Sequence, residues 1–168
     1  PADSRCVVYE TIESSTEFWI KGENFSVSTM LLDNELAAKM RSIAIFRLAP
    51  QDYHRFHFPV DARIVSHKCI QGEYYTVNPM AVREAVDVFT ENVRTVTVLD
   101  SPQFGTVVYV CVGAMMVGSI VLTAPAGQNV KRLDESGYFA FGGSTVIVMF
   151  EENAIEFDGD LVENSKIP

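Results

Sequence analysis

The segment FGGST at residues 141–145 combines residue types that could do chemistry on the chain itself. It places the hydroxyl of Ser144 directly after Gly142 and Gly143 and directly before an apolar run. Two glycines let the backbone adopt strained dihedral angles and approach another group closely. That freedom is what a serine needs in order to attack the carbonyl of the residue before it. A glycine turn leading into a strand is the ordinary alternative for such a segment.

Two of the three histidines, His54 and His57, lie close together in the segment DYHRFHFP at residues 52–59. On a helix this spacing would place both rings on one face, whereas on a strand or loop it places them on different faces. Pro59 disfavours a long helix here, so we expect the two rings to contact different partners. A zinc site would need further ligands, and the three cysteines are scattered singly, so we expect no metal site. Taken alone, the pair is typical of buried, hydrogen-bonded histidines.

The third segment that could take part in chemistry is PADS at the start of the chain, where Asp3 precedes a run of strand-forming residues. An early aspartate of this kind most often caps a turn. None of the three segments is therefore specific by itself.

Most of the remaining chain predicts β-strands. Short runs rich in β-branched and aromatic residues lie at residues 6–10, 17–20, 43–48, 63–67, 95–99, 106–112, 119–122 and 145–150, with glycine and proline turns between them. Only residues 28–40 show helical spacing, and Asp33 or Asn34 is placed to cap a second turn there. We expect a mainly β (α+β) domain with an antiparallel β-sandwich or barrel-like core and short helical insertions.

Size and charge exclude several classes of protein. The 168 residues suit one domain, and a hydrophobic content of 48% is enough for a core. The net charge of −9 argues against a nucleic-acid partner and against docking on anionic lipid by charge alone. The most apolar stretch, residues 105–124, contains glycines and predicts two buried strands rather than a membrane span. Many acidic residues lie after residue 150, and we expect them to face solvent.

Together, six blocks of sequence are far more specific than any one of them. They are PAD at 1–3, RLAPQDYHRFHFP at 47–59, VNP at 77–79, TENVR at 90–94, VGAMMVGSI at 112–120 and GYFAFGGST at 137–145. In this order they resemble the phosphatidylserine decarboxylase family over nearly the whole chain. The sequence departs from the usual pattern at Ser4, Ala62 and Gly142. The GGST form, with FWIKG at 18–22, resembles the eukaryotic endomembrane type.

The resemblance implies that Asp3, His57 and Ser144 form a self-processing triad. Asp3 would orient His57, and His57 would take the proton from the Ser144 hydroxyl as it attacks the carbonyl of Gly143. The products would be a β chain of residues 1–143 and an α chain of residues 144–168. Ser144 would become a covalent pyruvoyl group, which serves as the cofactor.

The resemblance also implies an activity, a partner and a location. The activity is decarboxylation of phosphatidylserine to phosphatidylethanolamine and carbon dioxide, with His54 as the proton donor. The partner is phosphatidylserine in a membrane, and the α and β chains of one precursor stay together. A homodimer is also compatible with the resemblance. We expect a peripheral protein of the Golgi, endosome or vacuole of a eukaryote, with membrane-binding and regulatory segments lying N-terminal to residues 1–168.

Three other functions compete with this interpretation. A pyruvoyl decarboxylase of a soluble amino acid would share the processing chemistry. A non-enzymatic domain of the biotinyl or lipoyl carrier type would need an exposed lysine at a hairpin tip, but Lys131 lacks the usual flanking residues. A hydrolase built on the same triad would need a G-x-S-x-G elbow, which GGSTV at 142–146 is not.

Overall fold

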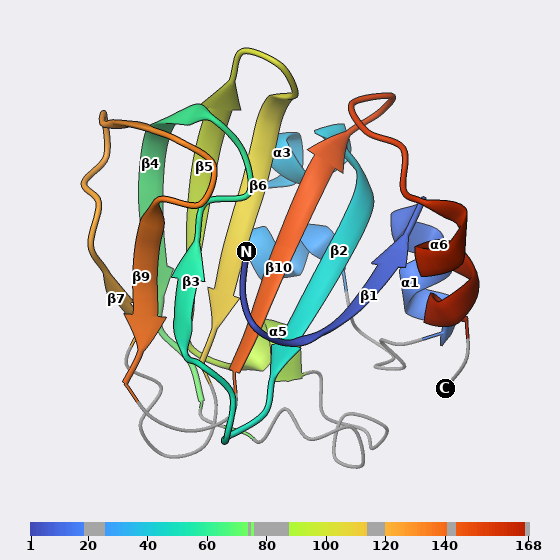
Figure 1. Ribbon diagram of the computed structural model, residues 1–168, viewed down its shortest axis with the longest axis horizontal. Helices are drawn as coiled ribbons and strands as arrows, with labels where there is room; N and C mark the ends of the chain where they lie inside the picture. The colour runs from blue at the N-terminus through green and yellow to red at the C-terminus, as the bar shows by residue number, and fades with distance from the viewer. Residues whose placement is uncertain (19–25, 74, 76–87, 114–119, 141–143, 167–168) are drawn as a thin grey trace.

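The protein consists of two antiparallel β-sheets packed face to face, with helices on the outer face of the larger sheet (Figure 1). The structure is a computed structural model that describes residues 1–18, 26–73, 75, 88–113, 120–140 and 144–166. The large sheet has the strand order β1 (Arg5–Tyr9), β2 (Met40–Leu48), β10 (Ser144–Glu151), β6 (Gly105–Val112), β5 (Arg94–Ser101), β4 (Ala62–Ile70) and β8 (Asn129–Val130). The small sheet has the order β3 (Arg55–His57), β9 (Glu135–Phe139) and β7 (Ile120–Leu122).

Strand β10 lies at the centre of the hydrophobic core. It pairs antiparallel with β2 on one side and with β6 on the other. Because side chains alternate along a strand, Val146, Val148 and Phe150 enter the core between the two sheets. Ile147 and Met149 enter the core between the large sheet and the helices. Burial on both faces explains why this strand reads as a continuous apolar run in the sequence.

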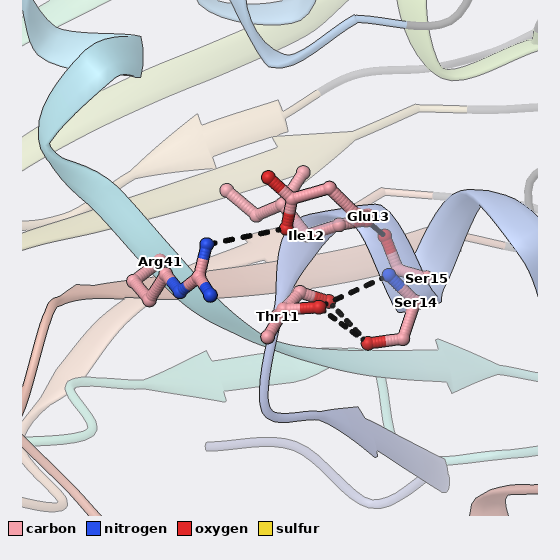
Figure 2. Close-up of polar contacts among 6 residues, drawn as sticks. All are labelled: Thr11, Ile12, Glu13, Ser14, Ser15 and Arg41. Carbon is pink, nitrogen blue, oxygen red and sulfur yellow. Dashed lines mark hydrogen bonds and ion pairs between the residues drawn. The ribbon is translucent and has the colours of Figure 1, made fainter.

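Five short helices flank the large sheet, namely α1 (Ile12–Phe18), α2 (Val27–Leu31), α3 (Asn34–Lys39), α5 (Val88–Glu91) and α6 (Gly159–Ser165) among the described residues. Helices α2, α3 and α5 cover the outer face, whereas α1 and α6 lie beside β1 (Figure 1). Helix α1 begins after Thr11, whose hydroxyl accepts the N–H of Ser14 at 3.2 Å. Figure 2 shows this turn together with the 3.4 Å ion pair between Glu13 of α1 and Arg41 of β2.

The expected fold class is confirmed, because the described chain is mainly antiparallel β with short helical insertions. Seven of the eight expected strands are present. They are β1 (expected at 6–10), β2 (43–48), β4 (63–67), β5 (95–99), β6 (106–112), β7 (119–122, with residue 119 outside the described part) and β10 (145–150). After residue 150, the acidic side chains are exposed apart from half-buried Glu151, which accepts the N–H of Thr106 at 3.4 Å. No helix in the described part of the chain is long and apolar enough to cross a membrane.

Two predicted elements are wrong. Residues 28–40 form two helices rather than one, because Leu32 adopts a left-handed conformation (φ 49°) and ends α2. The carboxylate of Asp33 then caps α3 by accepting a backbone N–H at 2.9 Å, as the sequence predicted. Glu17 and Phe18, expected in a strand, end α1 instead, and residues 19 and 20 lie outside the described part. The cap at Thr11 starts a helix, and this helix continues through Glu17 and Phe18 despite their place in the expected strand.

The C-terminal helix α6 closes the outer edge of the large sheet. The hydroxyl of Ser165 accepts the N–H of Val8 at 2.8 Å and donates to the carbonyl of Leu161 at 2.6 Å. Ser165 is buried, so this bond satisfies a strand-edge donor away from water. The segment that begins at Ser144 therefore contacts the sheet twice, through β10 and again at β1.

Gly137 of β9 lies directly opposite Phe56 of β3 in the small sheet. A Cβ atom at this position would meet the carbonyl oxygen of Val121 and would lie 2.8 Å from the ring of Phe56. Phe56 is fully buried in the core between the sheets. Only glycine therefore fits between β7 and this ring without moving the backbone.

We expect Gly137→Ala to lower the free energy of unfolding by about 1–3 kcal/mol, because the added methyl group overpacks the core. The matched control is Gly159→Ala at the start of α6, where a Cβ meets nothing within 4 Å. The control should leave stability unchanged or raise it by up to about 1 kcal/mol. Chemical denaturation of the two variants measures the difference. Equal stability of both variants would contradict the packing around Gly137.

Candidate functional site

Strand β10 starts and β2 ends at the same end of the large sheet, the lower end in Figure 1. Ser144 opens β10 opposite Leu48, the last residue of β2. One residue further along, Thr145 pairs with Arg47, and Arg47 pairs in turn with Arg5 of β1. Asp3 precedes Arg5 by two residues, so it lies just before the start of β1, which is at the same sheet end as the start of β10, whereas the N-terminus itself lies at mid-height in Figure 1. Gly142 and Gly143 lie outside the described residues.

The hydroxyl of Ser144 is buried and has no hydrogen-bond partner among the described residues. Strand alternation places this side chain on the face of β10 that carries Val146 and Val148, toward the small sheet. A buried hydroxyl without a partner costs about 1–3 kcal/mol, so its presence calls for a reason. A hydroxyl that no hydrogen bond holds in place is free to turn toward a carbonyl carbon, as a nucleophile must.

His57 ends β3, and its backbone is held from two sides. Its N–H donates to the carbonyl of Pro1 at 2.8 Å, and its carbonyl accepts from the hydroxyl of Tyr109 at 3.3 Å. Burial raises the pKa of Tyr109 well above its ordinary value, so this phenol keeps its proton and remains a donor. The strand register shifts between Phe56 and His57, and such bulges re-aim a side chain. The half-buried ring stacks on Tyr53, with ring centroids 6.4 Å apart.

His54 lies just before β3 and contacts a different set of groups. Its Nδ1 lies 2.6 Å from the carbonyl oxygen of Asp52, and because a carbonyl only accepts, Nδ1 carries a proton. The His54 ring meets the Phe139 ring edge-on, with centroids 6.4 Å apart. The prediction that the two histidines contact different partners is confirmed. The non-helical conformation of this segment is the reason.

Asp3 is exposed and lines a cavity of about 840 Å³ at this end of the sheet. Tyr53 lines the same cavity and stacks on His57, and Pro1 bonds to the backbone of His57. The structure therefore brings the segments of Asp3, His57 and Ser144 to one region. Among the described residues, no hydrogen bond joins the side chains of Asp3 and His57, or those of His57 and Ser144. Hydrogen bonds between catalytic groups often tighten only as the reaction proceeds.

Sequence reasoning missed a pair of arginines in this cavity. Arg5 and Arg47 face each other directly across β1 and β2, and both line the cavity. Burial, and secondarily the positive charge of Arg5, lower the pKa of Arg47 from its ordinary value. A guanidinium nevertheless stays protonated in proteins. The two residues lie 42 positions apart, so only the strand register reveals that they are opposite.

The proposed carrier-type lysine has a different setting. Lys131 pairs with the carboxylate of Asp61 at 3.1 Å, and its backbone N–H donates to Asp134 at 2.7 Å. The turn that holds it lies near the end of the small sheet opposite Ser144, toward the top of Figure 1. The lysine is therefore part of a turn held by two aspartates, away from the serine and the histidines.

Comparison with known proteins supplies the family. The sequence model described as phosphatidylserine decarboxylase matches residues 1–167. The chain is 57% identical over 168 residues to phosphatidylserine decarboxylase proenzyme 3 of Schizosaccharomyces pombe, covering 99% of this chain and 17% of that protein. It is 51% identical over 173 residues to proenzyme 2 of Saccharomyces cerevisiae, covering 98% of this chain and 15% of that protein.

A bacterial relative is nearly as similar. The phosphatidylserine decarboxylase proenzyme of Chlamydia pneumoniae is 48% identical over 169 residues, which are 99% of this chain and 56% of that protein. The chain thus spans about a sixth of the length of the two fungal relatives and about half of the bacterial one. By the match over residues 1–167 and by these identities, this chain belongs to the phosphatidylserine decarboxylase family.

Proposed function

We propose that this chain is the catalytic part of a self-processing phosphatidylserine decarboxylase, cut between Gly143 and Ser144 into a β chain (residues 1–143) and an α chain (residues 144–168). Family membership supports the proposal, and the relatives are named proenzymes. The observation that carries it is the hydroxyl of Ser144, which is buried at the first residue of a central strand and has no partner in the described part of the chain.

The surroundings of Ser144 fit a pyruvoyl group derived from that residue. The pairing of Ser144 with Leu48 holds the main chain in place, while nothing in the described part of the chain binds the hydroxyl. When present, the pyruvoyl group supplies a carbonyl that takes up the electrons left when carbon dioxide departs. The protein must hold the serine headgroup, keep water out and deliver a proton.

We assign these tasks to the two histidines and to Asp3, which lines the cavity. His57 takes the proton from the Ser144 hydroxyl during self-cleavage, and Asp3 orients His57. His54 delivers a proton to the α-carbon during decarboxylation, since an imidazole ring can act as a general acid. The different contacts of the two rings, Tyr53 for His57 and Phe139 for His54, support separate tasks.

The location is also a proposal. We infer a peripheral membrane protein of the eukaryotic endomembrane system, because the substrate is a membrane lipid and the two fungal relatives share more than half of their aligned residues with this chain. Fractionation of cells that express the tagged protein, followed by an alkaline carbonate wash, tests peripheral attachment. A homodimer stays a prediction that native mass measurement would decide.

Ser144→Ala should leave the chain whole and without decarboxylase activity, because no hydroxyl remains to attack Gly143. The matched control is Ser136→Ala on β9, which also removes a buried, unpartnered hydroxyl. The control should cleave normally and lose no stability, since it removes only an orphaned polar group. Intact-mass measurement of both variants decides the matter. Cleavage of Ser144→Ala at the same bond would exclude the serine mechanism.

The two histidine variants should separate processing from turnover. His57→Ala should block cleavage because the base is lost. His54→Ala should still cleave, yet lose decarboxylation by ~10²- to 10⁴-fold, the usual contribution of a general acid. Gel analysis of cleavage and release of labelled carbon dioxide give the two readouts. Normal cleavage and normal turnover in both variants would remove both assignments.

Asp3→Asn should fold with an unchanged melting temperature, because Asp3 is exposed, but should cleave more slowly. The orienting aspartate of a serine-protease triad is worth ~10⁴-fold in rate. Self-cleavage is a single intramolecular turnover with its reactants in place, so we expect a smaller slowing of roughly 10- to 100-fold. A time course of α-chain appearance after refolding measures it. Wild-type kinetics in the folded variant would leave His57 without this orienter.

A further inference from the structure

A row of polar side chains crosses three neighbouring strands beside Ser144. Arg5 of β1 pairs with Arg47 of β2, and Arg47 pairs with Thr145 of β10. Paired residues share one face of a sheet, and alternation places this row on the face of Ile45 and Ile147, which is opposite the Ser144 hydroxyl. The row therefore borders residue 144 on the face opposite its hydroxyl, and its two arginines line the same cavity as Asp3.

The two guanidinium groups of this row form no ion pair with any described residue. Like charges directly opposite each other on a sheet are destabilising. The ion pairs of the described residues involve Arg41, Arg55 and Lys131, and none includes Arg5 or Arg47. This is unexpected in a chain with 22 acidic residues against 13 basic ones. The positive charges of Arg5 and Arg47 therefore repel each other, although a nearby carboxylate could have neutralised them.

Two carboxylates line the same cavity as the arginines but form no ion pair with them. One oxygen of Asp52 accepts the N–H of Ala49 at 2.7 Å and so fixes the turn after β2. Asp3 is the residue assigned to orient His57. The cavity of about 840 Å³ is large enough for a small charged group, and Arg47 at its wall is partly desolvated. Guanidinium groups in such a setting bind phosphate or carboxylate with forked hydrogen bonds.

Thr145 adds a second observation that points to a ligand. Its hydroxyl is fully buried and has no hydrogen-bond partner among the described residues. It follows Ser144 directly and lies one strand spacing, ~4.8 Å, from Arg47. The row thus holds two guanidiniums, which line the cavity, and a buried unsatisfied hydroxyl next to the reacting residue.

We propose that Arg5 and Arg47 hold the phosphate of the phospholipid headgroup while the serine moiety lies at residue 144. This inference rests on the proposed function. Phosphate fits better than the serine carboxylate, because a guanidinium bound to the carboxylate would stabilise the group that must leave and so oppose decarboxylation. The phosphate does not change during the reaction. Its binding therefore contributes equally before and during the chemical step, and its loss should raise KM more than it lowers kcat.

The test uses Arg47→Gln and Arg5→Gln in the full natural chain, with phosphatidylserine in micelles of a neutral detergent. Each variant should cleave normally. Its melting temperature should be unchanged or higher, because the repulsion between the two guanidinium groups is removed. Its KM for the lipid should be roughly 10- to 100-fold higher, with kcat nearly unchanged. Arg47→Lys should recover part of the loss, since it restores the charge but not the fork. The matched control is Arg63→Gln, an exposed arginine near the opposite end of the sheet, which should behave as wild type.

Competition with inorganic phosphate separates a headgroup site from a free-phosphate site. Inorganic phosphate should compete with the lipid in wild type and lose this effect in Arg47→Gln. If Arg47→Gln abolishes phosphate inhibition yet leaves the lipid KM unchanged, the headgroup assignment is wrong. An unchanged KM in both arginine variants that still turn over overturns the inference while the proposed function stands. Failure of the wild-type chain to cleave or to release carbon dioxide overturns the proposed function itself.

Discussion

The pairing of β10 between β2 and β6 fixes the position of Ser144, around which the site is arranged. The strand is bonded on both edges and buried on both faces, so a slip by one residue would turn Val146 and Ile147 out of their separate cores. Ser144 is the first residue of that strand, and its main chain is therefore held by the register. The packing of the whole sheet can offset the cost of an unpartnered hydroxyl, which is small beside the burial of the strand.

The same strand explains how a cut chain would stay together. A segment that starts at Ser144 would keep all of β10 inside the sheet and would also carry α6. Helix α6 reaches past β2 to β1, where Ser165 accepts the N–H of Val8. The short chain would thus hold the longer one at the centre and at the edge of the sheet. The edge contact also fixes the strand that follows Asp3, so the C-terminal segment helps to position the N-terminal one.

The sequence was sufficient to predict the strands that are apolar on one or both faces, because β-branched runs between turns have few other uses. The prediction from sequence failed where a helix cap competed with the strand or helix pattern, at Thr11 and at Asp33. It also missed the short strands β3 and β9, because their apolar and polar residues alternate over too few positions to be recognised. The reacting segments were recognisable from their order along the chain. Arg5 and its opposition to Arg47 were not, because a residue's cross-strand partner depends on register, which no local pattern encodes.

The alternation of β10 divides the proposed chemistry between the two faces of the sheet. The side chain of Ser144 points toward the small sheet. Strand β3 of that sheet ends at His57, and the next residue, Phe58, lies in the core between the sheets. Thr145 and Arg47 point the other way, toward the helices. The main-chain Cα of residue 144 lies in the plane between these faces, where groups on either side can reach it. The Ser144 hydroxyl and the guanidinium groups would then act from opposite faces of the sheet, and only Asp3 lines the cavity of the arginines as well as serving self-cleavage. A change in headgroup contacts that spares Asp3 could therefore leave self-cleavage intact.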